Sequence, residues 1–371
     1  MYKNYWWPLE WAEKLKEKPL RIKALGQDLV AYRLETGTAQ VMSDLCMHRG
    51  GALSDGWIEA SCLVCPYHGW TYKADGVCVK IPANQPGMPI SKKARVDSYP
   101  TIEKYGFIWA FLGDLPEAER PPLPELPNIS NPNLKRIEGE YLWKANYERV
   151  MENGLDIAHA PFVHGGAFGN RKEPDVPEFE VEHWTGGAGG TVTLKPPPAK
   201  GLWKYLYKKD RPGVKTRTGF FMPCITMLEV HLPFGLMALI DINLPIDEQT
   251  TLTKWVSMRG FFKGDWADND TRRRVLKIFE QDRPIVEAQR PELVPVDISA
   301  ELHVPSDAIQ IAYRKLRKSV LDKGWGIDAH RIRAEHSVEA TVIPSPGRRE
   351  VPELASAWVK KEVPVRKGDL S

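Results

Sequence analysis

Two short arms, each with one Cys and one His, constrain this chain more than any other sequence feature. The first arm reads CMH from Cys46 to His48, the second reads CPYH from Cys65 to His68, and sixteen residues separate them. Two thiolates and two imidazoles at one site suit a two-iron cluster in which the Cys pair holds one iron and the His pair the other. Such a cluster takes up and returns one electron at a time, so the pattern predicts redox chemistry.

A structural zinc site is the alternative, because two Cys and two His can also bind zinc. Zinc fingers usually keep like ligands together, as a Cys pair followed by a His pair. Here each arm carries one of each kind, so like ligands must meet from different arms, as a mixed cluster requires. Gly50 and Gly51 follow the first arm and Gly69 follows the second, and these glycines allow tight turns beside the sulfurs. We therefore favour the iron–sulfur cluster over zinc.

Length and charge narrow the class of protein. A chain of 371 residues is long for one core, so two domains are expected. The 51 basic and 48 acidic residues give a net charge of +3, which offers no reason to expect a nucleic-acid partner. The five cysteines, at least two of them claimed by the cluster, favour a reducing compartment. With neither an apolar leader nor a long apolar run, we expect a cytoplasmic protein that does not enter a membrane.

A proline-rich stretch divides the chain. Residues 115–132 contain six prolines and cannot form a regular helix or a central strand. We expect an α+β protein with a small all-β domain first and a larger domain of strands and helices after it. The expected parts are a cluster domain at 1–115, a linker at 116–132, a second domain at 133–335 and a C-terminal tail at 336–371.

Hydrophobic patterns place the expected elements. Strand-like runs cover 20–24, 29–34 and 107–112 before the linker, and 226–232, 236–244 and 252–258 after it. Helical periodicity covers 146–160, 266–290 and 306–323. The proline- and aromatic-rich stretch 195–209 is read either as a lid or as a surface excursion.

A second constellation follows the linker. Asp156 and His159 are three residues apart, so on a helix they share a face. Pro161 should end or kink that helix, which lets His164 approach from the next turn. Two imidazoles and a carboxylate suit an Fe(II) site with positions left open for oxygen. Alone, this pattern also fits a surface helix with two ordinary histidines; the upstream cluster favours the metal.

A further carboxylate comes from the helix expected at 266–290. Asp282 falls on its apolar stripe, and a carboxylate aimed at a core is costly unless it is paired or binds a metal. Pro284 should kink the helix at that point. A buried salt bridge is the alternative for Asp282, and Glu287 is the weaker candidate ligand. The stripe itself consists of Val275, Ile278, Phe279, Ile285 and Val286.

The motifs CMHRGG and CPYHGW, with the downstream segments 146–164 and 281–289, resemble those of Rieske non-haem iron oxygenases. Respiratory and photosynthetic Rieske proteins carry a disulfide pair where this chain has Gly51 and Trp70. The resemblance is to the short, single-chain terminal oxygenase component, the α-subunit. It implies a helix-grip-like catalytic domain, in which helices flank an antiparallel sheet. The implied metal sites are a [2Fe-2S] cluster on Cys46, His48, Cys65 and His68, and Fe(II) on His159, His164 and Asp282, supported by Glu152 and Asn153.

The resemblance also implies an activity. Electrons from NAD(P)H would arrive through a separate ferredoxin and/or flavin reductase, since the chain has neither a dinucleotide-binding fingerprint nor plant-type ferredoxin cysteines. With O2 as co-substrate, the Fe(II) site would hydroxylate a C–H bond of a small cyclic or aromatic molecule. The alternatives within the family are oxidative O- or N-demethylation and ring dihydroxylation. Outside it, the alternative is an electron carrier without oxygenase activity.

Finally, the resemblance implies a head-to-tail homotrimer. In such a ring, Asp156 of one subunit would bridge its own His159 and His68 of a neighbour. A carboxylate can accept a hydrogen bond from the outer N–H of each imidazole, which fixes tautomer and orientation.

Overall fold

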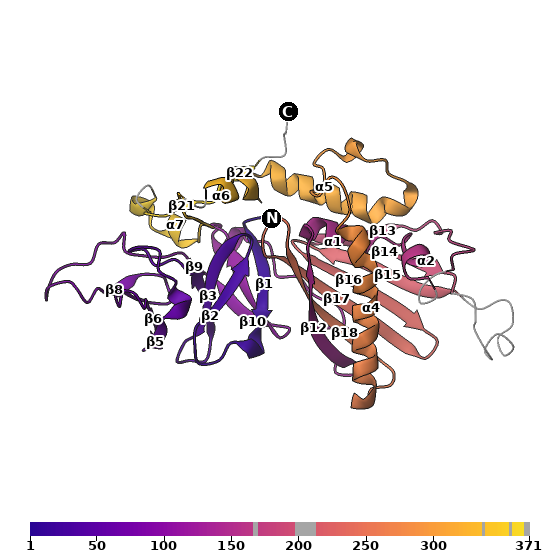
Figure 1. The fold of residues 1–371 in the computed structure, drawn as a ribbon, viewed down its shortest axis with the longest axis horizontal. Coiled ribbons are helices and arrows are strands. Elements are labelled where there is room, and N and C mark those ends of the chain that lie inside the picture. Colours follow the sequence, from indigo (N-terminus) through magenta and orange to yellow (C-terminus); the bar gives the residue numbers. More distant parts are fainter. Residues whose placement is uncertain (166–169, 197–212, 336–337, 356–357, 367–371) are drawn as a thin grey trace. The chain divides into compact units, whose positions relative to one another are not determined.

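The computed structural model describes residues 1–165, 170–196, 213–335, 338–355 and 358–366 (Figure 1). The chain forms two compact units, each continuous in space but not in sequence. The first comprises Met1–Leu123, Leu244–Glu248 and the described part of Val320–Lys367; the second comprises the described parts of Pro124–Asn243 and Gln249–Ser319. The candidate lid lies outside the described residues from position 197 onward. Among the described residues, no helix has the length and apolar character needed to cross a membrane.

The first unit begins with three antiparallel sheets, which confirms the expected all-β N-terminal domain. Their strand orders are β2-β3-β4-β9, β5-β6-β7-β8 and β1-β11-β10. All six residues of β11 are buried, as a continuous apolar strand requires. The strands are β1 (Tyr5–Trp11), β2 (Leu20–Ala24), β3 (Gln27–Arg33), β4 (Ala39–Ser43), β5 (Trp57–Glu59), β6 (Cys62–Val64), β7 (Thr71–Tyr72), β8 (Cys78–Lys80), β9 (Ser98–Tyr99), β10 (Thr101–Lys104) and β11 (Phe107–Leu112).

The C-terminal segment packs into this first unit, whereas the sequence suggested a separate tail from residue 336. Its described elements are α6 (Ala329–Glu335), α7 (Gly347–Glu350) and the strand pairs β19 (Gly326–Ile327) with β22 (Val365–Arg366) and β20 (Thr341–Val342) with β21 (Lys361–Glu362). The physical reason is the buried Asp97 carboxylate. It accepts hydrogen bonds from Ser345 N at 2.9 Å and from Arg348 Nε and a terminal guanidinium nitrogen at 2.8 Å each. No pattern within residues 336–371 predicts that this segment binds Asp97, which lies far away in the sequence.

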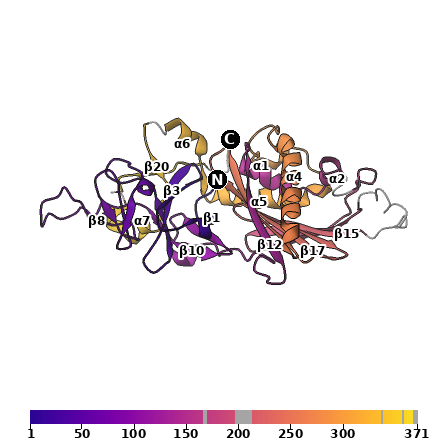
Figure 2. The same ribbon diagram turned by 60° about the horizontal axis from the view of Figure 1, so that its bottom comes forward.

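The second unit is built on a seven-stranded antiparallel sheet. Its order is β12-β18-β17-β16-β15-β14-β13, so β13 to β18 follow one another as a meander and β12 closes the far edge. Figures 1 and 2 show helices α1 and α4 on one face of this sheet, which is the expected sheet flanked by helices. The strands are β12 (Lys135–Trp143), β13 (Val181–Trp184), β14 (Gly187–Leu194), β15 (Val214–Phe221), β16 (Ile225–Leu232), β17 (Gly235–Pro245) and β18 (Thr251–Arg259).

The helices of this unit are α1 (Tyr147–Leu155), α2 (Ala160–Val163), α4 (Asp268–Val286) and α5 (Ala308–Asp322), the last of which continues three residues into the first unit. On α4, Val275, Phe279 and Val286 are buried, as the apolar stripe predicted, but Ile285 is 45% exposed. The helix also continues through Pro284 to Val286, because the proline lies in its last turn. Packing of Phe279 against Trp143, with ring centroids 5.6 Å apart, anchors α4 on the sheet.

Candidate functional site

The two Cys/His arms form matched loops. In the first, Gly50 N donates to Cys46 O at 2.8 Å; in the second, Gly69 N donates to Cys65 O at 3.0 Å. Both glycines have a φ of 68°, a left-handed conformation that favours glycine. A second hydrogen bond closes each loop: Cys46 N donates to Gly51 O, and Cys65 N donates to Trp70 O, both at 2.9 Å. The sequence therefore folds each arm into the same tight turn, with its sulfur at the start.

The side chains of these loops segregate by type. Cys46 and Cys65 are buried, whereas His48 and His68 are exposed with ring centroids 4.5 Å apart. Like ligands thus lie together from different arms, as the mixed-cluster interpretation requires. His48 also stacks on Trp70, with ring centroids 4.8 Å apart and an interplanar angle of 5°.

The sulfur side of this group fits a metal cluster. Burial raises the pKa of the Cys46 thiol to about 11, and Tyr72 Oη lies 3.2 Å from its sulfur. A thiol in such a place ionises only with a strong positive charge nearby, and a bound metal provides one. A Cβ at Gly51 would lie 3.5 Å from Cys65 Sγ, so the glycine leaves space beside the sulfur. These residues are therefore suited to hold a [2Fe-2S] group.

The second constellation begins at the end of α1. Asn146 caps the N-terminus of this helix by accepting from Glu148 N at 3.0 Å. The helix ends at Leu155, earlier than the expected residue 160, and Asp156 is extended. Asp156 and His159 thus do not share a helix face. They approach through a turn in which Asp156 Oδ1 accepts from Ala158 N at 2.8 Å, and Asp156 Oδ2 lies 3.6 Å from His159 Nδ1.

Three side chains converge next to this turn. His159 and His164 flank the short helix α2, and their Nε2 atoms are 3.2 Å apart. Asp282 Oδ1, from α4, lies 3.2 Å from His164 Nε2 and 3.6 Å from His159 Nε2. All three candidate ligand atoms lie within 4.8 Å of one another. Elements more than 110 residues apart in the chain thus present two imidazole nitrogens and one carboxylate oxygen to a single point.

The outward nitrogen of each imidazole faces a polar side chain, at hydrogen-bond distance for His164 and at 3.6 Å for His159. His164 Nδ1 lies 3.0 Å from Gln281 Oε1, and His159 Nδ1 faces Asp156. Burial would lower the pKa of His159, but Asp156 and the charge of Asp282 together outweigh burial, and the pKa is raised. Sequence reasoning missed Gln281 as an orienting residue, although its position beside Asp282 on α4 was a usable signal. Such outer partners fix the tautomer and orientation of a metal ligand.

This trio fits a divalent metal. Asp282 and His164 are each only 4% exposed, and Asp282 Oδ1 has no hydrogen-bond partner among the described residues. A buried, unsatisfied carboxylate is costly, and a bound cation removes that cost. Two His and one carboxylate with open positions suit non-haem Fe(II).

The other candidates lie elsewhere. Glu287 accepts from Lys144 N at 3.0 Å at the end of α4, so it does not join the trio. Glu152 turns away from the trio and binds Arg314 of α5. Asn153 lines the adjoining cavity. Of the two expected supporting residues, one therefore braces the helix and the other faces the cavity.

A cavity of about 660 Å3 adjoins the trio within the second unit. Its wall comes from α1, α4 and alternate residues of β15, β16 and β17, which point to one face of the sheet. Apolar side chains dominate this wall, with a few polar groups among them. The wall residues used below are Thr218, Thr226, Leu228, Leu239, Asp241 and Asn243.

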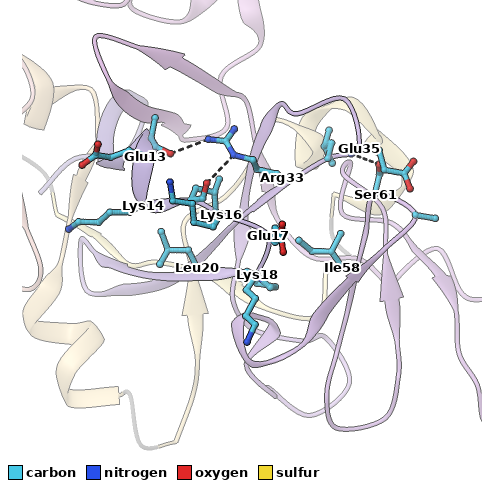
Figure 3. Close-up of a pocket in the computed structure, with 15 residues that line it drawn as sticks. Glu13, Lys14, Lys16, Glu17, Lys18, Leu20, Arg33, Glu35, Ile58 and Ser61 are labelled. Carbon is cyan, nitrogen blue, oxygen red and sulfur yellow. Dashed lines mark hydrogen bonds between the residues drawn. The ribbon is translucent and has the colours of Figure 1, made fainter.

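A larger hollow, of about 1090 Å3, lies in the first unit and has a different character (Figure 3). Charged side chains of both signs line it, among them Arg33, whose guanidinium donates to the carbonyls of Ala12 and Leu15 at 3.0 Å. Neither Cys/His arm nor the trio contributes to it. The cavity beside His159 is therefore the better candidate for chemistry.

Comparison with known families agrees with this two-unit arrangement. Residues 5–100 match the family model of the Rieske [2Fe-2S] domain. Residues 143–323 match the model of the vanillate O-demethylase oxygenase C-terminal domain. The chain therefore belongs to the Rieske oxygenases and is a terminal oxygenase component, an oxidoreductase. Membership implies an iron–sulfur cluster, a non-haem iron, a small-molecule substrate and electron-transfer partners.

Individual relatives agree with the family. The chain is 28% identical over 333 residues to the methylxanthine N1-demethylase NdmA of Pseudomonas putida, a match that spans 84% of this chain and 87% of the relative. The solved structure of P. putida NdmA superposes with a TM-score of 0.72 at 27% identity, covering 86% of this chain and 91% of that one. Dicamba monooxygenase bound to dicamba shares the fold, with a TM-score of 0.68 at 22% identity over 86% and 97% of the two chains.

Proposed function

We propose that this chain inserts one oxygen atom of O2 into a C–H bond of a compact, largely apolar cyclic molecule bound beside His159, His164 and Asp282. The convergence of these three side chains at the wall of a mostly apolar cavity is the observation that carries this proposal. Iron bound by the trio would supply O2 activation, with electrons from the cluster on Cys46, His48, Cys65 and His68.

The chain's own residues have distinct roles in this proposal. Asp156 and Gln281 hold the two imidazoles with Nε2 directed inwards. Apolar wall residues such as Leu228 and Leu239 exclude water and bind the ring system of the substrate. A dry, shaped site strengthens the electrostatic interactions within it and prevents side reactions.

Electrons would come from NAD(P)H through a separate ferredoxin and/or flavin reductase. We further propose a head-to-tail homotrimer in which Asp156 joins its own His159 to His68 of the next subunit. Two observations support this route: the side chain of Asp156 is 30% exposed beside His159, and His68 is exposed on its own unit. Both residues are thus accessible to a neighbouring copy, and a ring closes such a head-to-tail interface.

Oxidative demethylation is the second candidate, and the match to a methylxanthine N1-demethylase over 84% of this chain favours it. Hydroxylation of a methyl group on nitrogen or oxygen gives an unstable carbinol. The carbinol breaks its bond to the heteroatom and releases formaldehyde. The same first step, insertion of oxygen into a C–H bond, therefore leads to either outcome, depending on the carbon that the cavity presents.

The test is turnover by the purified holoprotein with a surrogate ferredoxin and reductase. We expect substrate-dependent O2 consumption that Asp282→Ala abolishes while the cluster spectrum persists. Formaldehyde as a product identifies demethylation, and a stable product carrying 18O from 18O2 identifies hydroxylation. A holoprotein that carries electrons from the reductase but consumes no O2 with any member of a substrate library would instead indicate an electron carrier.

A further inference from the structure

One acidic side chain of the cavity wall has no role in the metal site. Asp241 lies on β17 on the same face as Leu239 and Asn243, which flank it at alternate positions. Thr226 of β16 lies directly opposite Asp241 in the antiparallel ladder and also faces the cavity. The carboxyl group of Asp241 is therefore held on the rigid sheet, at the wall that a bound molecule contacts.

The Asp241 carboxyl has no hydrogen-bond or ion-pair partner among the described residues, and its Oδ1 is buried. Two other polar side chains of this wall, Thr218 and Asn243, have hydrogen-bond partners. Thr218 Oγ1 donates to Gly154 O at 3.1 Å, and Asn243 Oδ1 accepts from Thr253 Oγ1 at 2.7 Å. A buried polar group without a partner normally costs stability and calls for an explanation. A ligand that supplies the missing partner is such an explanation.

The charges around the cavity leave Asp241 as the unmatched group. Asp282 belongs to the trio, Asp156 faces His159, and Lys195 is paired with Glu173. Burial, and secondarily the charge of Asp282, raises the pKa of Asp241 to about 8. The first cause is independent of any metal on Asp282. Burial therefore disfavours the ionised form of this side chain, and a cation placed beside it would favour that form.

We propose that Asp241 determines substrate specificity by binding a protonated nitrogen, so that the substrate is a compact, largely apolar ring system with one basic amine or amidine group. This inference rests on the function proposed above and narrows its substrate class. An ionised carboxylate only accepts hydrogen bonds, and an ammonium group only donates them, so the two are complementary in charge and in hydrogen bonding.

Two other roles fit the observations less well. A structural carboxyl would bind a neighbouring backbone or side-chain donor, as Asp97 binds Ser345 and Arg348 in the first unit. A fourth metal ligand would lie with the trio, but the group of converging ligand atoms comprises only His159, His164 and Asp282 among the described residues. The remaining alternative is a protonated Asp241 that donates to a carbonyl of the substrate.

Three probes with one bicyclic frame separate these possibilities. They are 1,2,3,4-tetrahydroisoquinoline, which carries a protonated amine, 2-tetralone, which carries a carbonyl, and tetralin, which carries neither. Their dissociation constants are measured by calorimetry with the iron-loaded wild-type protein and with Asp241→Asn, Asp241→Leu and the control Glu182→Gln. Glu182 is an exposed acid on β13 outside the cavity wall, so this control removes one negative charge without touching the site.

We expect the wild type and Glu182→Gln to bind the amine at least about tenfold more tightly than tetralin or the ketone, the range of a charge-assisted hydrogen bond. Asp241→Asn and Asp241→Leu should lose that preference. Equal binding of amine and tetralin overturns the inference, as does tighter binding of the ketone, retention of the preference in Asp241→Asn, or no detectable binding of the amine.

A second measurement excludes a purely structural role. Because Asp241 has no partner among the described residues, Asp241→Leu should leave the melting temperature of the substrate-free protein unchanged or raise it. A fall of several degrees would point to a structural contact. Iron content and the cluster spectrum, measured on the same preparations, keep the two proposals apart. Full metal content with no amine preference overturns the Asp241 inference alone, whereas missing iron or cluster overturns the oxygenase proposal itself.

Discussion

Glu152 of α1 and Arg314 of α5 form a buried, two-point ion pair, with N–O distances of 2.5 and 2.9 Å. Glu301 binds Arg314 at 2.5 Å and Arg149 at 2.9 Å, and Arg149 also donates to Glu152 at 3.3 Å. This network binds the face of α1 that points away from the cavity. The chain then continues from α1 directly into Asp156 and His159. The placement of the metal ligands thus depends on charges that do not touch the metal.

Glu152→Gln should therefore destabilise the second unit. The change leaves Glu301 as the one carboxylate of this network for both Arg149 and Arg314. Breaking a buried ion pair in this way typically costs about 3–5 kcal/mol. Thermal or urea unfolding measures the loss. The matched control is Glu335→Gln, which removes the exposed partner of Arg331 and should cost less than about 1 kcal/mol. Equal stabilities of the two variants would show that the buried network contributes little.

Asp282→Ala should lose the mononuclear iron and keep the cluster. Iron content is then expected to fall from about three to about two per chain, with the visible and EPR spectra of the cluster unchanged. The reverse loss is expected for Cys65→Ser, which removes a cluster ligand but leaves the trio intact. An Asp282→Ala protein with full iron content would show that another residue supplies the carboxylate, and Glu287→Ala is the control for that outcome.

Gln281→Leu should weaken iron binding without removing a ligand. The amide oxygen of Gln281 orients His164 through Nδ1, at 3.0 Å. Loss of such an outer partner typically costs about 10–100-fold in metal affinity. Competition with a chelator gives the affinity, and Gln281→Glu should restore most of it because a carboxylate also accepts from Nδ1. Unchanged affinity in Gln281→Leu would mean that packing alone orients the imidazole.

Mixing two inactive chains tests electron transfer between subunits. Cys65→Ser removes the cluster and Asp282→Ala removes the iron, so neither chain alone should turn over substrate. In a mixed head-to-tail ring, an intact cluster on one subunit faces an intact iron site on the next, so co-expressed chains should recover part of the activity. Transfer within one chain predicts no recovery, because no chain then has both centres.

Asp156→Ala should separate metal binding from turnover. Asp156 faces the outward nitrogen of His159 and is not among the three converging ligand atoms. We expect the variant to keep its cluster spectrum and most of its iron, yet to reoxidise the reduced cluster far more slowly when substrate and O2 are added. Stopped-flow absorbance follows that reoxidation. Wild-type kinetics in this variant would rule out Asp156 as the bridge.

Some of this protein could be predicted from the sequence, because the signals were local. The glycines after the two Cys/His arms predicted a tight turn beside each sulfur, and both arms form such a turn. The apolar stripe of α4 identified Asp282 as an acid on the buried face. Helix and strand periods repeat within a few residues, so a single segment reveals which of its faces is buried.

Other features depended on contacts between distant segments. Helix α1 ends at Leu155, so Asp156 lies outside it. No periodic pattern in the sequence predicted that end. The packing of the C-terminal segment in the first unit depends on Asp97, which lies 251 residues before Arg348. Asp241 appears in the sequence as one acid within an apolar strand. Only the register of β17 against β16 and the placement of α1 and α4 turn it towards the cavity, because strand pairing and helix docking decide what an inward-facing side chain meets.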